Sequence, residues 1–241
     1  MDIILVPGLW LDASSWDSVR PALEAAGHHA TALTLPGVGE PADASADLGM
    51  SDWVDAVVTQ IDATPGPVVL VGHSGGGNVV WGAADARPDR VARVIFVDTV
   101  PPAPGSGISE FPVVDGVIAF PGWDFFPEED VHDLDAETRT RTLALTKTVP
   151  ARVPTDPIAL AGDRHRVAVT MLMGSLSQEE LEAQIDQWGE YGEEYRAIDD
   201  VTVKKIGSGH WPQFSVPDRL ATLINESVAH PQAAVDGDHG A

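Results

Sequence analysis

A serine flanked by glycines is the feature of this sequence with the clearest chemical meaning. The run that contains it reads Gly72-His73-Ser74-Gly75-Gly76, which fits the pattern G-x-S-x-G. Residues 68–71 before it are apolar and mostly β-branched, which predicts a strand buried on both faces. Apolar residues at helical spacing follow, so the serine lies at a tight turn from a strand into a helix. Such a turn holds the Ser74 hydroxyl above the sheet, near the positive end of the helix, and predicts a nucleophile.

Two other interpretations of this glycine-rich turn involve no nucleophile. A phosphate-binding loop would need Gly-Lys-Ser or Gly-Lys-Thr at its end, and no lysine follows Ser74 here. A turn that only packs a strand against a helix stays open as an alternative. The predicted strand before the turn and the predicted helix after it favour the nucleophile.

A histidine is the expected partner of this serine. A serine hydroxyl is a weak nucleophile at neutral pH and needs a base to accept its proton, and the ordinary histidine pKa is about 6.5. Of the eight histidines, His210 follows the last predicted strand, so it belongs at the same edge of a parallel sheet as Ser74. We predict that His210 is the base; a loop histidine bound only by the backbone is the alternative. His132 and His165 are candidate substrate contacts.

An acid must hold such a histidine in the correct tautomer and stabilise its charged form. The loop after the strand that precedes the strand of His210 contains no acid at residues 173–178. Asp98 directly follows another predicted strand and lies between Ser74 and His210 in the chain, so we choose Asp98. The alternative role of Asp98 is to close a turn; Glu179 and then Asp163 are the next candidates for the acid.

Backbone N–H groups are expected to stabilise the oxyanion that forms when the serine attacks a carbonyl. One donor should be Gly75, directly after the nucleophile, and the second should come from the loop after the first strand. Leu9 is our choice there, with Trp10 as the alternative. One such donor lowers the barrier by roughly 3 kcal/mol.

Composition and charge exclude several classes of function. The chain has 241 residues, a net charge of −23 and no cysteine, which rules out disulfides and cysteine chemistry and disfavours binding to nucleic acid or anionic lipid. No apolar run approaches the ~20 residues of a membrane span. No signal peptide pattern is seen at the start, so the cytoplasm is the expected location.

Alternating strand and helix patterns predict the fold that positions these residues. They indicate an α/β protein with a doubly wound, mostly parallel sheet, whose site lies at the carboxyl ends of the strands. We expect one domain over residues 1–230 and a flexible tail over residues 231–241.

The alternation stops after the strand that ends at Asp98. Residues 101–166 are rich in proline and glycine and are too long for a simple connection. We interpret this stretch as a lid inserted over the strand ends; a second small core and a disordered linker are the alternatives. Its aromatic residues, together with Trp10, predict a pocket for an apolar or aromatic small molecule. These residues are Phe120, Trp123, Phe125 and Phe126.

Nearly the whole chain resembles the α/β-hydrolase superfamily, and within it the small esterase-like enzymes with a compact lid. The runs that carry the resemblance are Gly72-His73-Ser74-Gly75-Gly76 and Gly209-His210-Trp211-Pro212-Gln213-Phe214. The resemblance implies a serine hydrolase for a carboxylic ester or lactone, working through an acyl-enzyme with no cofactor and no metal. Some members of the superfamily carry the acid about 24 residues after the nucleophile, and Asp98 follows Ser74 by 24 positions.

Two departures and two alternative functions accompany this resemblance. Pro7-Gly8 stands where the family has His-Gly, and the common position of the acid is empty. A carbon–carbon bond hydrolase or a hydroxynitrile-lyase-like enzyme is the first alternative; such lyases often use a lysine, and the nearest in the predicted lid is Lys147. A non-catalytic binding module of the same fold is the second alternative.

Overall fold

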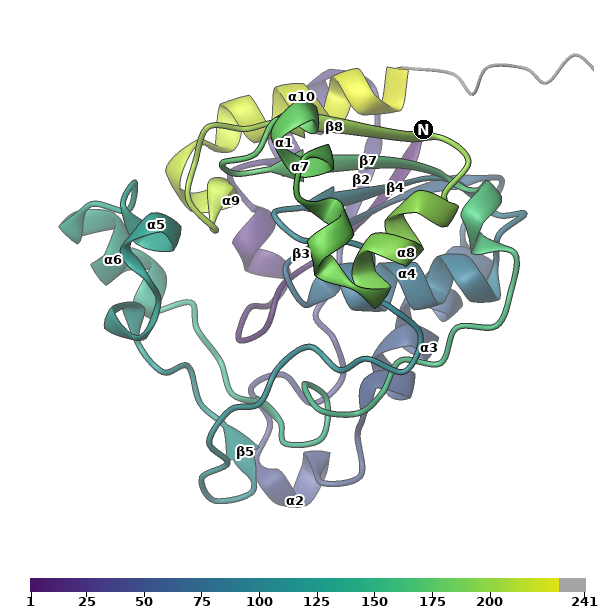
Figure 1. The fold of residues 1–241 in the computed structure, drawn as a ribbon. Coiled ribbons are helices and arrows are strands. Elements are labelled where there is room, and N and C mark those ends of the chain that lie inside the picture. Colours follow the sequence, from purple (N-terminus) through teal and green to yellow (C-terminus); the bar gives the residue numbers. More distant parts are fainter. Residues whose placement is uncertain (230–241) are drawn as a thin grey trace, which may run out of the picture.

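The chain forms one six-stranded sheet in the computed structural model, which describes residues 1–229 (Figure 1). All neighbouring strands pair parallel, in the order β2-β1-β3-β4-β7-β8. The strands are β1 (Asp2–Val6), β2 (His29–Ala32), β3 (Val68–His73), β4 (Val91–Val97), β7 (Ala168–Met173) and β8 (Val201–Lys205). The prediction of a doubly wound parallel sheet is confirmed. The predicted tail, residues 231–241, lies outside the described residues.

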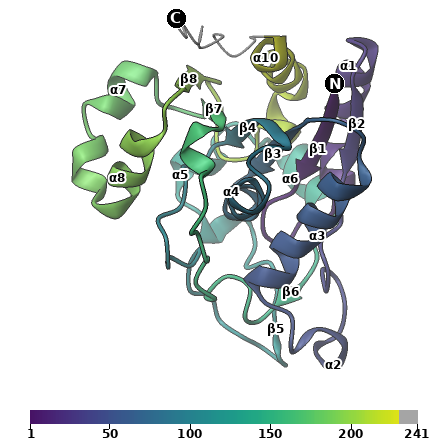
Figure 2. The ribbon, with the colours of Figure 1, turned by 90° about the vertical axis from the view of Figure 1, so that its right-hand side faces the viewer.

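Alternate residues of each strand belong to two separate cores, one on each face of the sheet. Ile3 and Leu5 of β1 pack beneath α1 (Arg20–Ala25) and α10 (Pro217–Ala229). Ile4 and Val6 pack on the other face, beneath α3 (Met50–Ala63) and α4 (Gly76–Ala86). Figure 2 shows these two helical layers on either side of the strands. Because both faces are covered, the inner strands β1, β3, β4 and β7 are mostly apolar, without a regular alternation of polar residues.

The first helix is shorter than its sequence pattern predicts. The apolar spacing of residues 12–26 predicts one helix, but the structure has a 3₁₀ turn, Ala13–Trp16, followed by α1. Pro21 lies in the first turn of α1, where its missing N–H costs no hydrogen bond. The same effect divides the C-terminal helix, because Pro217 begins α10 after the separate short helix α9 (Pro212–Ser215).

Residues 101–166, called here the lid segment, contain short elements; residues 128–143 lie beyond the carboxyl ends of the strands, whereas residues 164–166 lie just before the start of β7 (Figure 1). The segment holds β5 (Val117–Ile118) and β6 (Val149–Pro150), which pair antiparallel, α5 (Glu128–Val131), α6 (Ala136–Leu143) and two 3₁₀ turns, Trp123–Phe125 and Arg164–Arg166. Its action as a lid stays a prediction. The remaining elements are α2 (Ala42–Ser45), α7 (Gln178–Glu182), a 3₁₀ turn (Ile185–Trp188) and α8 (Glu190–Ala197). Within residues 1–229, none of the helices has the length and apolar character needed to cross a bilayer.

Candidate active site

Ser74 occupies the turn between β3 and α4, and its backbone is in the left-handed region with φ 51°. Non-glycine residues adopt this conformation rarely, and it is frequent at functional sites. The glycines around Ser74 are needed for close packing. A Cβ on Gly72 would lie 2.5 Å from the Gly76 carbonyl oxygen, and a Cβ on Gly76 would lie 2.5 Å from the Pro7 carbonyl oxygen. The G-x-S-x-G pattern therefore reflects contacts of backbone with backbone.

His210 and Asp98 come together with Ser74 at the carboxyl edge of the sheet. The Nε2 atom of His210 lies 2.9 Å from the Ser74 hydroxyl oxygen, and its Nδ1 atom lies 2.7 Å from a carboxylate oxygen of Asp98. A carboxylate at Nδ1 accepts the proton of that nitrogen, which leaves the lone pair of Nε2 for the serine hydroxyl. This arrangement can remove a proton from Ser74.

Several groups keep the Asp98 carboxyl ionised. Burial by itself would raise its pKa, but the hydrogen bond and charge of His210 outweigh this effect, so the pKa of Asp98 lies below its ordinary value. The Gly174 backbone N–H adds a hydrogen bond of 2.6 Å to the second carboxylate oxygen. A Cβ on Gly174 would lie 2.8 Å from that oxygen, so glycine is required there. Asp98 also has a left-handed backbone, with φ 47°.

Residues of the lid segment hold the loop that carries His210. The His210 backbone N–H donates to the Asp130 carbonyl oxygen at 2.8 Å, and the Gly209 N–H donates to an Asp133 carboxylate oxygen at 2.8 Å. A Cβ on Gly209 would approach the Asp130 carbonyl to 2.3 Å. Glycine is therefore needed beside His210 because the backbone of the lid segment passes close to it.

His73, the residue before Ser74, fixes the same loop from the other side. Its Nε2–H donates to the His210 carbonyl oxygen at 2.7 Å, and its Nδ1 accepts from the Gln213 side-chain amide at 3.2 Å. Burial, together with the nearby charge of His210, lowers the pKa of His73 to about 3. His73 is therefore neutral at pH 7 and has partners at both ring nitrogens, so it positions His210 rather than exchanging protons with Ser74.

The two residues chosen as oxyanion donors lie side by side. A Cβ on Gly75 would lie 3.2 Å from Cγ of Leu9, so the loop after β1 meets the turn of Ser74 here. Trp10, the alternative donor, has φ 63°, and its carbonyl accepts a 2.8 Å hydrogen bond from the Lys147 backbone N–H. The lid segment thus contacts the loop that would bind the oxyanion. The donor roles of Gly75 and Leu9 stay predictions.

A cavity of about 210 Å³ opens at the Ser74 hydroxyl and His210. It is lined by Leu9, Trp10, His73, Ser74, Ile108, Ser109, Phe111, Phe126, Asp130, His210 and Trp211. Two of the predicted pocket residues, Trp10 and Phe126, are among them. The sequence indicated neither Ile108, Phe111 nor Asp130, since an isolated residue in an irregular loop has no periodicity that would mark it.

Three other predicted pocket residues do not line this cavity. Trp123 is buried and packs edge-on against Trp211, with ring centroids 5.0 Å apart. Phe120 stacks behind Phe126 at 5.7 Å, and Phe125 is 56% exposed. The aromatic residues of the lid segment form a second layer that supports the cavity wall, because large rings bury more surface against one another than at an open pocket.

The alternative acids and candidate substrate contacts lie elsewhere. Glu179 is exposed in the first turn of α7, and Asp163 is exposed before the turn Arg164–Arg166. His132 is exposed. His165 contacts Glu194 at 3.1 Å and is not among the residues that line the cavity at Ser74; its role as a substrate contact, like that of His132, stays a prediction.

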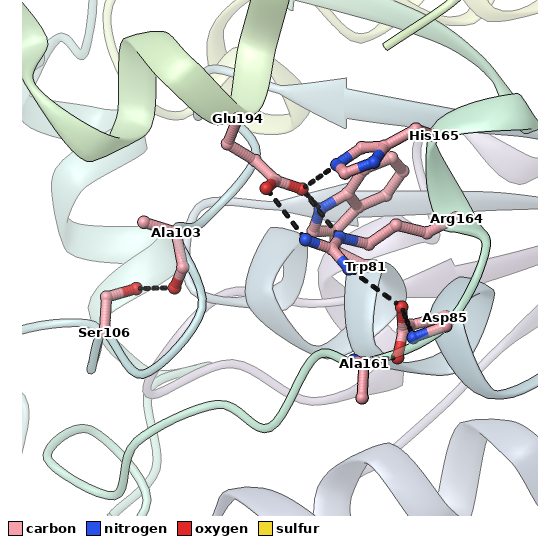
Figure 3. Close-up of polar contacts among 9 residues, drawn as sticks. Trp81, Asp85, Ala103, Ser106, Ala161, Arg164, His165 and Glu194 are labelled. Carbon is pink, nitrogen blue, oxygen red and sulfur yellow. Dashed lines mark hydrogen bonds and ion pairs between the residues drawn. The ribbon is translucent and has the colours of Figure 1, made fainter. Parts of the chain in front are cut away.

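A second polar cluster, called here the Arg164 cluster, joins the end of the lid segment to α4 and α8 (Figure 3). The Arg164 guanidinium donates to both carboxylate oxygens of Glu194, at 2.6 and 2.8 Å, and to Asp85 at 3.0 Å. The Trp81 indole N–H also donates to Glu194, at 2.7 Å, and His165 completes the cluster. The sequence did not indicate this cluster, because its members come from distant elements and share no motif.

Comparison with known proteins agrees with the α/β fold described above. The sequence model of the alpha/beta hydrolase family matches residues 3–223. Esterase PIR7B of Oryza sativa subsp. japonica is 41% identical over 108 residues, which are 42% of this chain and 40% of that protein. Methylesterase 8 of Arabidopsis thaliana is 35% identical over 102 residues, which are 41% and 38%. These matches span about two fifths of the length of the curated relatives.

A solved structure extends the likeness to nearly the full chain. The crystal structure of the methylesterase protein MES16 from Arabidopsis has a TM-score of 0.73 and 21% sequence identity, and the match covers 95% of this chain and 98% of that chain. At this level of identity, the likeness concerns the fold.

Proposed function

This chain belongs to the alpha/beta hydrolase family, and we propose that it is a serine hydrolase that cleaves a carboxylic ester or lactone through Ser74, His210 and Asp98. One observation carries the proposal. A single imidazole lies 2.9 Å from the hydroxyl of a serine in a strained turn and 2.7 Å from a carboxylate. This geometry is the one that general-base activation of a serine needs.

In the first half of the reaction, the Ser74 oxygen attacks the ester carbonyl carbon while His210 accepts the serine proton. The carbonyl oxygen becomes negative, and the backbone N–H groups of Gly75 and Leu9 donate hydrogen bonds to it. When the tetrahedral intermediate collapses, its bond to the alcohol oxygen breaks. His210 returns the proton to that oxygen, which leaves an acyl group on Ser74.

In the second half, a water molecule takes the place of the alcohol. His210 accepts one proton of the water as the water oxygen attacks the acyl carbon. The bond to Ser74 then breaks and the proton returns to the serine oxygen, which releases the acid and restores the enzyme. Asp98 stabilises the charged imidazole in both halves.

The cavity supports a small and largely apolar substrate. Its walls include the rings of Trp10, Phe111, Phe126 and Trp211, and its volume of about 210 Å³ suits a compact ester better than a long chain. Names of the relatives, which include esterases and a methylesterase, support the same class of substrate. The net charge of −23 disfavours a nucleic acid as substrate or partner.

The lyase alternative finds less support. Among superfamily members, hydroxynitrile lyases often use a lysine near the serine. The Lys147 amine here pairs with the Asp12 carboxylate at 3.8 Å, and Lys147 is not among the residues that line the cavity. This placement favours ester hydrolysis over cyanohydrin cleavage.

A fluorophosphonate probe tests the proposal, because it labels only an activated serine. We expect labelling of the native protein at Ser74, hydrolysis of short p-nitrophenyl esters, and a fall in kcat of roughly 10⁴-fold or more for Ser74→Ala. Ser175→Ala, at an exposed serine after β7, is the control and should keep both properties. Absence of labelling would favour the non-catalytic binding module. Turnover of cyanohydrins or β-diketones without turnover of esters would favour the lyase.

A further inference from the structure

Asp130 is the one acidic side chain among the described residues that line the cavity at Ser74, and none of these residues is lysine or arginine. It lies on α5, in the lid segment, and its backbone carbonyl holds the loop of His210. The mechanism proposed above uses this carbonyl for positioning and leaves the carboxylate without a role. The carboxylate forms no hydrogen bond or ion pair with any of residues 1–229.

The negative charge of Asp130 is therefore poorly compensated. Burial raises the pKa of Asp130, and the neighbouring negative charge of Asp98 raises it further, against an opposite effect of His210. A positively charged group placed in the cavity would relieve both unfavourable effects. A half-buried carboxylate without a partner, at the wall of a cavity that contains no basic lysine or arginine, points to a ligand that pairs with it.

Aromatic rings that line the same cavity as Asp130 favour the same kind of ligand. Phe126 and Trp211 meet edge to face with centroids 4.7 Å apart, and Trp10 and Phe111 meet in the same way at 4.8 Å. A cation over the face of such rings is attracted by their quadrupole. The net charge of −23 draws cations and repels anions at long range. Three independent features thus favour a cationic substrate.

We propose that Asp130 and the aromatic wall form a subsite for an ammonium group, so that the preferred substrates are small esters that carry a positive charge. This inference rests on the proposed serine hydrolase function. It specifies, within small esters in general, esters with a cationic group on either the alcohol or the acyl side. Asp130 is a specificity residue here, and bond cleavage remains with Ser74 and His210.

Two pairs of esters matched in shape test the inference. Acetylcholine and 3,3-dimethylbutyl acetate differ only in the charge on the alcohol side. The methyl esters of 5-aminopentanoic acid and hexanoic acid differ in the charge at the end of the acyl side. We expect the native protein to prefer the cationic member of at least one pair by about tenfold in kcat/KM, as expected for an ion pair sheltered from water. Asp130→Asn should remove this preference by lowering kcat/KM for the cationic ester only.

Glu129→Gln is the matched control, because it removes the same charge from an exposed neighbour on α5 that does not line the cavity. It should keep the preference. Equal turnover within both pairs, or an equal loss for charged and neutral esters in Asp130→Asn, would overturn the inference. An equal loss would mean that Asp130 acts only through His210. Hydrolysis of the neutral esters that depends on Ser74 would still uphold the proposed function, so the two failures are distinguishable.

Discussion

Helix α4 has a polar cluster at each end, and the two clusters differ in one physical respect. The array at its N-terminal end consists of Ser74, His210 and Asp98, and the Arg164 cluster contacts the later turns through Trp81 and Asp85. Both contain a carboxylate that pairs with a nitrogen-containing side chain from a distant part of the chain, His210 in the first and Arg164 in the second. The first contains a nucleophile beside the cavity at Ser74, whereas the second borders a hollow that is lined by Arg164, His165 and Glu194 and has no nucleophile of this kind.

The central ion pair of the Arg164 cluster is buried, and its hydrogen bonds are satisfied. The side chains of Arg164 and Glu194 are 6% and 4% exposed, and both oxygens of Glu194 accept hydrogen bonds. Burial alone would raise the pKa of Glu194, but hydrogen bonds from Arg164 and Trp81 and the charge of Arg164 outweigh it, so the pKa lies below its ordinary value. These charges are ionised and paired with one another.

The array at Ser74 is more exposed, and a cavity lies beside its nucleophile. The side chains of His210 and Asp98 are 21% and 18% exposed, and the Ser74 hydroxyl faces the cavity wall on one side and His210 on the other. The comparison teaches that buried charge alone does not mark an active site. An active site also needs a nucleophile with open space beside it, in a conformation that the surrounding backbone enforces.

The largest effect that separates the two clusters should come from Asp98. Asp98→Asn removes the charge that stabilises protonated His210 and disturbs its tautomer, so we expect kcat on a neutral ester to fall by about 10³- to 10⁴-fold. Melting curves should show that the variant is folded. Glu179→Gln, which changes the exposed alternative acid, should alter kcat by less than about twofold. A larger loss for Glu179→Gln would move the assignment of the acid.

Arg164 should show the opposite profile, with a loss of stability instead of activity. Arg164→Met leaves the buried carboxylates of Glu194 and Asp85 without the arginine that neutralises them, so the free energy of unfolding should fall by about 3–5 kcal/mol in urea titrations. Arg166→Met makes the same change two residues away, where the arginine is 48% exposed and binds an 81% exposed aspartate. This control should cost less than about 0.5 kcal/mol. Equal losses in the two variants would mean that the Arg164 cluster contributes little to the free energy of unfolding.

These two clusters also show what the sequence could and could not predict. The turn of Ser74, the strand Val91–Val97 and the glycines around His210 leave local signatures, because close backbone approach demands glycine and buried strands demand β-branched residues. Ser74, Asp98 and His210 could therefore be predicted from the sequence as residues that follow the ends of strands. Their proximity follows from a rule of parallel sheets and needs no long-range detail.

The rest depends on packing between irregular segments. Nothing local distinguishes Phe126, which lines the cavity, from Phe125, which is exposed. The Arg164 cluster joins residues up to 113 positions apart, and charged residues in a sequence are usually solvated. Pro21 is a local signal that the periodicity of the first helix obscured, since apolar spacing continues across the break.

The smallest expected effect concerns pH and separates the clusters by the range in which each loses stability. Buried His73 has a pKa of about 3, against 6.5 for an unfolded chain. Because the unfolded state alone binds a proton between these values, stability is full above pH 6.5 and should fall by about 1.4 kcal/mol per pH unit as the pH decreases. The lowered pKa of Glu194 adds a loss only below its ordinary value of 4.5. Acid should therefore weaken the surroundings of Ser74 first.

Urea titrations between pH 6.5 and 5 measure this difference. His73→Gln removes the group that titrates, so its free energy of unfolding should change less over this range than that of the native protein, even if the variant is less stable at pH 7. His132→Gln, at an exposed histidine of the lid segment, should keep the native slope. If His73→Gln also keeps the native slope, another group takes up the proton. The assignment of His73 as a neutral ring that positions His210 would then have to be abandoned. If the slope is lost, the ring next to the nucleophile is shown to serve the fold while His210 serves the chemistry.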